Sequence, residues 1–250
     1  MRYFIEIAYN GSNYHGWQRQ PQSSSVQQML EEAISTILRA PISITGAGRT
    51  DTGVHAKQLF AHVDLDENWD TSDCEQFKYR LNRFLPPDIA ILNIIPVKTD
   101  AHARFDAVSR SYEYIINVEK NPFTTGLAYY FQHRLDIDAM NEAANFLVGS
   151  KDFKCFSKTN TDVNNYICAV TEACWEQRGS ELIFRVSANR FLRNMVRAIV
   201  GTLVEIGKGK QGVAHMQDVL VSRDRGVAGT SAPAHGLYLV SVKYLEEIFI

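Results

Sequence analysis

The spacing of apolar residues along the first hundred positions predicts alternating strands and helices. Apolar and polar residues alternate at period two, or form a continuous apolar run, in four stretches that we interpret as strands. These stretches are Arg2–Tyr9, 42–45, 59–65 and Ile89–Val97. Between the first and the second, and between the third and the fourth, apolar residues recur three and four positions apart, which predicts helices.

Both predicted helices have recognisable ends. Ser25 is an N-cap candidate for the first helix, and Pro41 ends it. The second helix is expected from about Ser72 to Leu85, where two prolines stop it. Its inward face is predicted to carry Phe77, Leu81 and Phe84. The order strand, helix, strand, strand, helix, strand matches one ferredoxin-like half.

Residues 108 to 116 alternate in the same way, so that Arg110, Tyr112 and Tyr114 share one face of a predicted strand. If exposed, the two tyrosine rings would form a base-stacking platform. If buried, they would be ordinary strand tyrosines, which is the commoner case. The pattern leaves both interpretations open.

The rest of the chain continues this mixture of elements. We expect a helix at 138–148, a hairpin of 169–177 and 181–188, a long helix that opens at Asn189, and a last strand at Leu237–Tyr244. In the long helix, Arg190, Arg193 and Arg197 are spaced to line the side opposite the buried stripe.

The composition narrows the class of protein. The 250 residues are 45% hydrophobic and 22% charged, as in a globular protein. Apolar stretches are shorter than the roughly 20 residues of a spanning helix, and no signal-peptide pattern begins the chain, so we expect no membrane association and a cytoplasmic location. The four cysteines form no CxxC pair, which argues against a zinc site or a disulfide framework.

Charge is distributed unevenly along the chain. Phe60–Gln76 contains six acidic residues and no Lys or Arg, whereas Arg178–Lys210 contains seven basic and two acidic residues. The second region would attract a polyanion. A solvated basic face would give the same count.

The most distinctive stretch is Gly46-Ala47-Gly48-Arg49-Thr50-Asp51-Thr52-Gly53-Val54-His55-Ala56, between two predicted strands. Its glycines allow a ligand to approach the backbone closely, and Asp51 would lie at the rim of a sheet. Arg49 would lie on the same side if the loop is extended. The spacing alone fits a solvated turn with an Asp–Arg pair equally well.

Common phosphate and metal motifs do not fit the chain. A dinucleotide fingerprint in this loop would need glycine at Asp51, and a P-loop would need Lys-Ser/Thr at Val54-His55. The stretch 207–212 satisfies the dinucleotide pattern, but it ends a predicted helix instead of following a strand, so we reject it. No cluster of Cys, His and carboxylates has the spacing of metal ligands, so no metal is expected.

The stretch from Gly48 to Ala56 resembles the signature of the tRNA pseudouridine synthase A family, in which the aspartate is the catalytic residue. Thr52 is the one change, where alanine is usual. The segment Asn13–Pro21 resembles the N-terminal family block, and could also stack bases and hold phosphate or simply pack. The resemblance spans nearly the whole chain, and it implies that Asp51 is catalytic.

Two later blocks assign further residues through the same resemblance. Ser109–Tyr114 resembles the block whose first tyrosine contacts the substrate, which implies this role for Tyr112. Phe191–Arg197 resembles the block whose basic residue, here Arg197, pairs with the catalytic aspartate. From their charge, we interpret Arg110, Arg190 and Arg193 as weaker RNA-binding candidates. Where the family usually has two prolines, this chain has Pro233-Ala234.

The resemblance implies an α+β fold. Two ferredoxin/RRM-like subdomains, expected at 1–103 and 104–250, would be joined into one antiparallel sheet with helices on one face and a cleft between the halves. It also implies a homodimer that binds tRNA and isomerises uridines 38, 39 and 40 of the anticodon stem-loop to pseudouridine, without a cofactor.

The implied chemistry suits a single carboxylate. Isomerisation cuts the N-glycosidic bond and rejoins the same uracil through carbon, whereas glycosidases that add water generally need two carboxylates. Arg49 and Arg197 would keep Asp51 ionised, because a nearby opposite charge offsets the effect of burial. Tyr112 would stack on the flipped base.

Two other classes of protein fit parts of this pattern. A non-catalytic RNA-binding protein on an RRM-like scaffold explains the sheet, the aromatic residues and the basic helix, but not Asp51, since a carboxylate repels phosphate. An aspartyl-nucleophile phosphatase fails because the second aspartate expected two positions on is Gly53.

Overall fold

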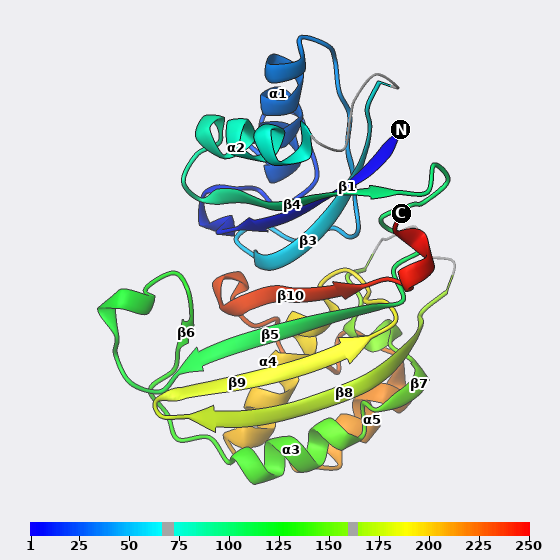
Figure 1. Cartoon of the computed structure of the whole chain (residues 1–250). Helices are drawn as coiled ribbons and strands as arrows, with labels where there is room; N and C mark the ends of the chain where they lie inside the picture. The colour runs from blue at the N-terminus through cyan, green and yellow to red at the C-terminus, as the bar shows by residue number, and fades with distance from the viewer. Residues whose placement is uncertain (67–72, 160–164) are drawn as a thin grey trace. The chain divides into compact units, whose positions relative to one another are not determined.

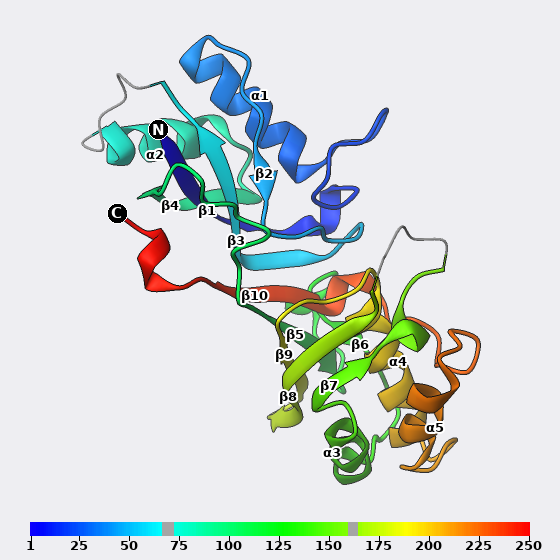
Figure 2. The same cartoon turned by 90° about the vertical axis from the view of Figure 1, so that its right-hand side faces the viewer.

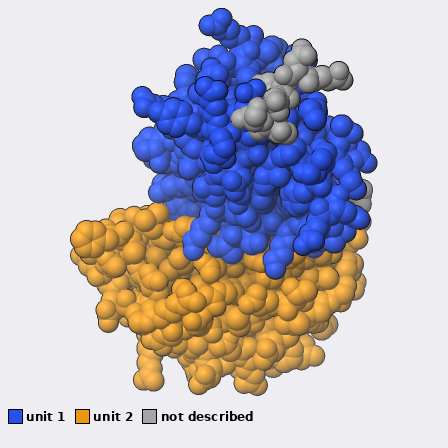
Figure 3. Space-filling view, in the orientation of Figure 1, with its two compact units in different colours: residues 1–108, 239–250 blue, residues 109–238 orange. Residues whose placement is uncertain are grey.

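The computed structural model describes residues 1–66, 73–159 and 165–250. They form two compact units, which Figure 3 colours separately. Unit 1 comprises Met1–Val108 and Leu239–Ile250, and unit 2 comprises Ser109–Tyr238. The expected division lay between residues 103 and 104 and assigned 239–250 to the second subdomain.

Unit 1 has the predicted order of elements. They are β1 (Arg2–Tyr9), α1 (Val26–Leu38), β2 (Thr45–Gly46), β3 (His55–Asp64), α2 (Cys74–Phe84) and β4 (Ile89–Val97). β1 is central, antiparallel to both β4 and β3, and β2 pairs with β3 (Figure 1). β2 shares only Thr45 with the strand expected at 42–45. The expected start of the second helix, at Ser72, lies outside the described residues.

Helices α1 and α2 lie on the same face of this sheet (Figure 2). α1 begins as predicted, because the Ser25 hydroxyl oxygen accepts a hydrogen bond from the Gln28 N–H at 3.2 Å. In α2, Phe77 and Leu81 are buried, but Phe84 is 54% exposed. The prediction that Phe84 faces inward is therefore wrong, because in the last turn of α2 it is Asn82 whose side chain contacts the sheet, through hydrogen bonds with the Ile91 backbone.

The C-terminal residues belong to unit 1 because their aromatic rings pack on β1 and β3. Ring centroids of Tyr244 lie 5.0 Å from Phe4 and 5.4 Å from Phe60, and Phe249 lies 6.3 Å from Phe4. Successive side chains of a strand point to opposite faces, so Phe4 faces away from its buried neighbours Tyr3 and Ile5. These aromatic contacts complete the core of unit 1.

Unit 2 combines mainly antiparallel strands with helices. Its elements are β5 (Ser109–Asn117), β6 (Tyr129–Tyr130), α3 (Ile137–Asn145), β7 (Gly149–Asp152), β8 (Ile167–Arg178), β9 (Glu181–Ala188), α4 (Met195–Gly207) and α5 (His215–Ser222). The strands β5, β9, β8 and β7 are neighbours in that order, and β6 runs parallel to β5. The hairpin around Arg178-Gly179 is confirmed.

β10 (Leu237–Lys243) spans the boundary of the two units, and short 3₁₀ helices complete the chain. In the described ranges, 3₁₀ helices lie at Gly11–Asn13, Pro122–Thr124, Lys154–Phe156, Ala234–Gly236 and Glu246–Ile248. Strands and helices that segregate into sheet and covering layer confirm the α+β class. The predicted cleft between the halves stays a prediction.

Candidate active site

Asp51 stands at the first position of a tight turn that leads into β3. Its carbonyl oxygen accepts a hydrogen bond from the Val54 N–H at 3.1 Å, and Gly53, at the third position, has a φ of 78°. A positive φ there is typical of a type II turn, and glycine adopts it at low cost. Asp51 is partly buried, whereas Arg49 and Thr52 are exposed. The turn thus presents the carboxylate at the rim of the sheet of unit 1.

The segment Gly11–Trp17 braces this turn through backbone hydrogen bonds. The Gly53 N–H donates to the carbonyl oxygen of Tyr14, and the Trp17 N–H donates to that of Thr50, both at 3.3 Å. The residues on either side of Asp51 are therefore held by a segment about 40 positions earlier. This arrangement restricts how far the Asp51 backbone can move.

Two glycines permit the close contact between the segment and the turn. A Cβ atom at Gly11 would lie 2.0 Å from the Val54 carbonyl oxygen, and one at Gly16 would lie 2.4 Å from the Thr50 carbonyl oxygen. The Gly11 N–H donates to Nδ1 of the buried His55 at 3.0 Å. His55 of the signature therefore acts as an internal acceptor for the bracing segment.

Tyr14 connects the same segment to the residue before β4. Its hydroxyl donates to Oδ1 of Asp88 at 2.5 Å, and Asn13 Nδ2 donates to the other carboxylate oxygen at 3.0 Å. Burial and this hydrogen bond raise the pKa of Tyr14. Tyr14 and Trp17 are only 6% and 2% exposed, so these rings of the segment Asn13–Pro21 pack inside unit 1 and do not stack on bases.

In unit 2, Tyr112 lies on β5 opposite Val186 of β9. Its partly buried ring meets Phe191 edge to face, with centroids 5.0 Å apart. Tyr114, on the same face, is fully buried, and its hydroxyl donates to the Pro233 carbonyl oxygen at 2.8 Å. Tyr114 is therefore a core residue, and the ring nearer the start of the strand, Tyr112, is the one that keeps partial access to solvent.

The prediction that a long helix opens at Asn189 is wrong. α4 begins at Met195, and Asn194 before it has a φ of 67°, in the left-handed region. The Asn189 carbonyl oxygen accepts a hydrogen bond from Arg110 Nη1 at 2.8 Å, and the Asn189 N–H donates to the Ala169 carbonyl oxygen at 3.1 Å. The bond from Arg110 occupies the Asn189 carbonyl oxygen, which in a helix would accept from the N–H four residues later.

The arginines consequently do not form one row on a helix. Arg190 and Arg193 precede α4, whereas Arg197 lies in its first turn. Arg193 is exposed and Arg190 is partly buried. Their predicted contact with phosphate stays a prediction, but it no longer follows from helical spacing.

Arg197 is oriented by residues 228–233, which we call the strap. Arg197 Nε donates to the carbonyl oxygen of Ala232 at 2.7 Å, and the Ala232 N–H donates to the Arg197 carbonyl oxygen at 2.9 Å. Asn194 Nδ2 donates to the Ser231 hydroxyl oxygen at 2.7 Å. One edge of the guanidinium group is thus fixed against the protein backbone.

Arg225 and a close glycine contact hold the strap in place. Arg225 donates to the carbonyl oxygens of Ala228 and Gly229 at 3.3 and 3.0 Å and to the Ser231 hydroxyl oxygen at 3.0 Å. A Cβ atom at Gly201 of α4 would lie 1.7 Å from the Thr230 carbonyl oxygen. The strap and α4 therefore pack backbone to backbone.

His235 follows the strap and was not among the predicted site residues. Burial lowers its pKa, and the positive charge of Arg197 lowers it further. Its ring meets Tyr129 of β6 at a centroid distance of 6.5 Å. The charge of Arg197 therefore favours the neutral form of the His235 imidazole. The only sequence signal was its place in Pro233-Ala234-His235-Gly236, the block that departs from the family pattern.

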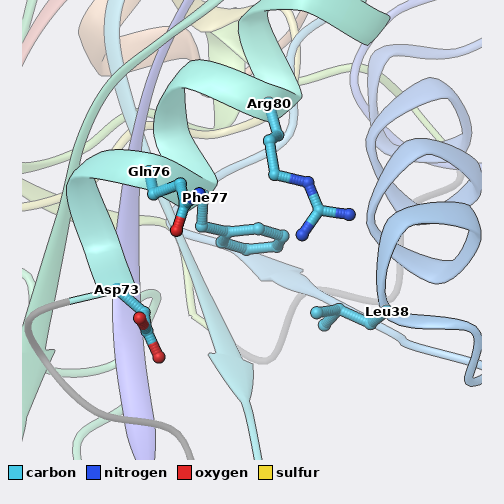
Figure 4. A pocket seen from close by; sticks show the side chains of 5 residues that line it. All are labelled: Leu38, Asp73, Gln76, Phe77 and Arg80. Carbon is cyan, nitrogen blue, oxygen red and sulfur yellow. The ribbon is translucent and has the colours of Figure 1, made fainter.

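Other features of the described residues do not add to the site. Figure 4 shows a hollow of unit 1 lined by Leu38, Asp73, Gln76, Phe77 and Arg80, none of which is a predicted site residue. In the described ranges, no three His, Cys, Asp or Glu residues are grouped so that they could bind a metal ion. No helix in this part of the chain has the length and apolar character needed to cross a membrane.

Comparison with known proteins identifies the family. The family model of tRNA pseudouridine synthase matches residues 6–106 and 143–245, which include Arg49, Asp51 and Arg197 and leave out Tyr112. The chain is 51% identical to tRNA pseudouridine synthase A of Porphyromonas gingivalis, over 100% of this chain and 99% of the relative.

Further relatives carry the same name. The chain is 49% identical to tRNA pseudouridine synthase A of Parabacteroides distasonis, over 99% of this chain and 98% of the relative. It is 38% identical to that of Bacillus pumilus, over 98% of this chain and 99% of the relative. Since both the family model and full-length relatives match, the chain belongs to the tRNA pseudouridine synthase family of isomerases.

Proposed function

We propose that this enzyme converts uridine to pseudouridine at positions 38, 39 and 40 of the tRNA anticodon stem-loop, with Asp51 as the reactive carboxylate. The turn of Asp51 supports this most directly, because its backbone is held by three hydrogen bonds while the side chain stays at the sheet rim. A surface that only binds RNA has no evident use for a fixed carboxylate, which repels phosphate. The alternative of a non-catalytic RNA-binding protein is therefore not favoured.

The reaction requires no group from outside. The N1–C1′ bond of uridine breaks and a C5–C1′ bond forms, C5 loses its proton to solvent, and N1 gains one. Atoms and electrons balance without an oxidant or a group donor, so no cofactor is required. Asp51 can contribute by attacking C1′ of the ribose, by adding to the base, or by removing a sugar proton.

The predicted neighbours have supporting roles in this proposal. Arg49 and the strap-held Arg197 supply positive charge that keeps Asp51 ionised when the bound base excludes water. Tyr112 stacks on the flipped uracil with the ring that is left partly exposed on β5. We further infer that the enzyme acts in the cytoplasm as a homodimer, an inference that rests on the family resemblance.

A tritium-release assay tests the proposal. tRNA carrying 5-tritiated uridine at only one of the three positions loses its label if the enzyme isomerises that uridine, and mere binding cannot release it. Asp51→Asn should lower single-turnover release by at least about a thousandfold while tRNA affinity stays within a few-fold, because only the reactive charge is removed. Asp73→Asn, an exposed carboxylate of the same unit, is the matched control and should react like wild type. Residual activity of Asp51→Asn above a tenth of wild type would exclude Asp51 as the reactive group.

A further inference from the structure

A hydrogen bond between two side-chain hydroxyl groups reaches the residue that precedes Asp51. The hydroxyl oxygens of Tyr9 and Thr50 are 2.9 Å apart, within the range of about 2.5 to 3.0 Å for a well-formed O–H···O hydrogen bond. Tyr9 is the last residue of β1 and is only 5% exposed, and Thr50 is partly buried. The bond therefore joins the central strand of unit 1 to the turn of Asp51.

Tyr9 is itself held firmly in the core of unit 1. Its backbone lies opposite Ala56 of β3 and Ile89 of β4 in the sheet. The centroid of its ring lies 6.3 Å from that of Trp17, whose indole packs on the backbone of Gly46, where a Cβ atom would lie 2.5 Å from the indole nitrogen. Because strand pairing fixes the Tyr9 backbone and ring packing limits its rotamers, the Tyr9 hydroxyl is a rigid point of attachment.

Backbone hydrogen bonds hold the peptide groups on both sides of Asp51. The Thr50 carbonyl oxygen accepts a hydrogen bond from the Trp17 N–H at 3.3 Å, and the Asp51 carbonyl oxygen accepts one from the Val54 N–H at 3.1 Å. Each peptide group is planar, so fixing both groups fixes φ and ψ of Asp51 and with them the direction of its Cα–Cβ bond. The direction of the carboxylate therefore depends on how firmly Thr50 is held.

The hydroxyl bond of Thr50 is shorter than the backbone bonds that join the turn to the segment Gly11–Trp17. Those bonds, from Gly53 to Tyr14 and from Trp17 to Thr50, are both 3.3 Å long, beyond the range of about 2.7 to 3.2 Å that is usual for N–H···O hydrogen bonds. A single dihedral angle separates the Thr50 hydroxyl oxygen from the backbone, so a fixed hydroxyl also restrains the Thr50 Cα atom. The bond to Tyr9 thus adds a short attachment one residue from Asp51.

We propose that Tyr9 is a positioning residue for the isomerisation, which acts through Thr50 on the orientation of the Asp51 carboxylate. This rests on the proposed function, because it takes Asp51 to be the group that reacts with uridine. A reactive group must be held within about 0.5 Å of its productive position, and a displacement of about 1 Å can slow a reaction about a hundredfold. Loss of the bond lets the direction of the carboxylate vary, so the reaction of bound tRNA slows while its affinity is kept.

Single-turnover tritium release at saturating enzyme tests the proposal. Tyr9→Phe and Thr50→Val each remove one hydroxyl with little change in shape, and each should slow release about tenfold while tRNA affinity stays within about twofold of wild type. Thr50→Ser keeps the hydroxyl and should release tritium within about threefold of the wild-type rate. The double variant Tyr9→Phe/Thr50→Val should be at most about twofold slower than either single variant, because both substitutions break the same bond.

Tyr244→Phe is the matched control. The Tyr244 hydroxyl donates to the Ala103 carbonyl oxygen at 2.6 Å, so this variant removes a hydrogen bond of unit 1 that the turn of Asp51 does not make. Its rate at saturating enzyme should stay within about twofold of wild type. An equal slowing in Tyr244→Phe overturns the proposal, because it traces the defect to general loss of stability. Losses that multiply to about a hundredfold in the double variant also overturn it, because the two hydroxyls then act independently.

Hydrogen exchange in the turn distinguishes failure of this proposal from failure of the proposed function. The Gly53 and Val54 N–H groups donate to carbonyl oxygens of Tyr14 and Asp51. They should exchange about tenfold faster in Tyr9→Phe than in wild type, and at the wild-type rate in the Tyr244 control. If wild type releases no tritium but exchange differs in this way, the proposed function fails while the anchoring of the turn by Tyr9 stands. Unchanged exchange in Tyr9→Phe overturns the anchoring, whatever the rate of tritium release.

Discussion

The turn of Asp51 in unit 1 and the segment before α4 in unit 2 both carry candidate site residues, but their backbones are shaped by different interactions. The turn closes with a hydrogen bond from Val54 to Asp51, three residues apart, and with Gly53 at a positive φ. The segment of unit 2 is shaped by hydrogen bonds to residues at 110, 158 and 169. Local interactions are visible in a sequence pattern, whereas these long-range bonds are not.

The two regions also orient their charged side chains differently. Asp51 is positioned through its backbone, since Thr50 and Gly53 on either side are held by the segment Gly11–Trp17. Arg197 is positioned through its own side chain, whose Nε donates to Ala232. A substitution that loosens the segment Gly11–Trp17 should therefore mainly lower the free energy of unfolding of unit 1. A substitution of Arg197 should mainly lower the rate of the reaction.

The largest effect is expected for Gly11→Ala. The new Cβ atom would lie 2.0 Å from the Val54 carbonyl oxygen, and because this is backbone, no rotamer change can relieve the contact. We expect the free energy of unfolding to fall by about 3 kcal/mol, as for a severely overpacked site, together with slower single-turnover release. Urea denaturation measures the first quantity. Gly48→Ala is the control, since nothing lies within 4 Å of its Cβ position. If the free energy of unfolding falls equally in both variants, the segment Gly11–Trp17 does not hold the turn of Asp51.

The next largest effect is expected for Arg197→Met, whose reaction rate is compared with that of Arg193→Met. If Arg197 supplies positive charge that supports the reaction of Asp51, its loss should slow single-turnover release about a hundredfold near neutral pH, which is about 2.7 kcal/mol. If Arg193 contacts phosphate, its loss should weaken binding and reduce the salt slope by about 0.9, while the rate at saturating enzyme stays within about threefold.

The measurement is the single-turnover rate as a function of enzyme concentration, up to saturation. The rate at saturating enzyme should be low in Arg197→Met and close to that of wild type in Arg193→Met. A defect in Arg197→Met that more enzyme restores would make Arg197 a phosphate contact like its neighbour.

The smallest expected effect compares one histidine from each unit. Burial, followed by the charge of Arg2, lowers the pKa of His62 to about 4, and its Nδ1 accepts a hydrogen bond from the Ala103 N–H at 3.1 Å. Because the folded-state pKa lies below the unfolded value of 6.5, neutral His62 stabilises the folded protein. This contribution to the free energy of unfolding is complete above pH 6.5 and is lost as the pH falls towards 4. The pKa of His235 is lowered in the same direction.

Urea denaturation between pH 7 and pH 4 tests this comparison. Over this range the free energy of unfolding of wild type should fall by about 2 kcal/mol because of His62. In His62→Gln this part of the pH dependence should be absent. His235→Gln should flatten it less, because His235 is the more exposed of the two residues. A larger change in His235→Gln would show that the site of unit 2 is the more pH-sensitive one.

The elements that the sequence predicted well are those whose cause is local. Ser25 caps α1, the alternation of 2–9 and 108–116 forms β1 and β5, and Arg178-Gly179 joins the hairpin β8–β9. Each depends on side chains and backbone groups a few residues apart, and period two or spacing of three and four reveals them directly. The turn of Asp51 belongs to this class, because Gly53 supplies its conformation.

Tertiary packing alone decided the remainder. It buried Trp17 and left Phe84 exposed. It moved the start of α4 to Met195. It also brought residues 239–250 to unit 1, through the rings of Tyr244 and Phe249. It also brought His235 under the influence of Arg197 and Lys158 beside Arg193. In each case the deciding partner is distant in the sequence, and the free energy of burial or of a long-range hydrogen bond outweighs the local preference of less than about 1 kcal/mol per residue.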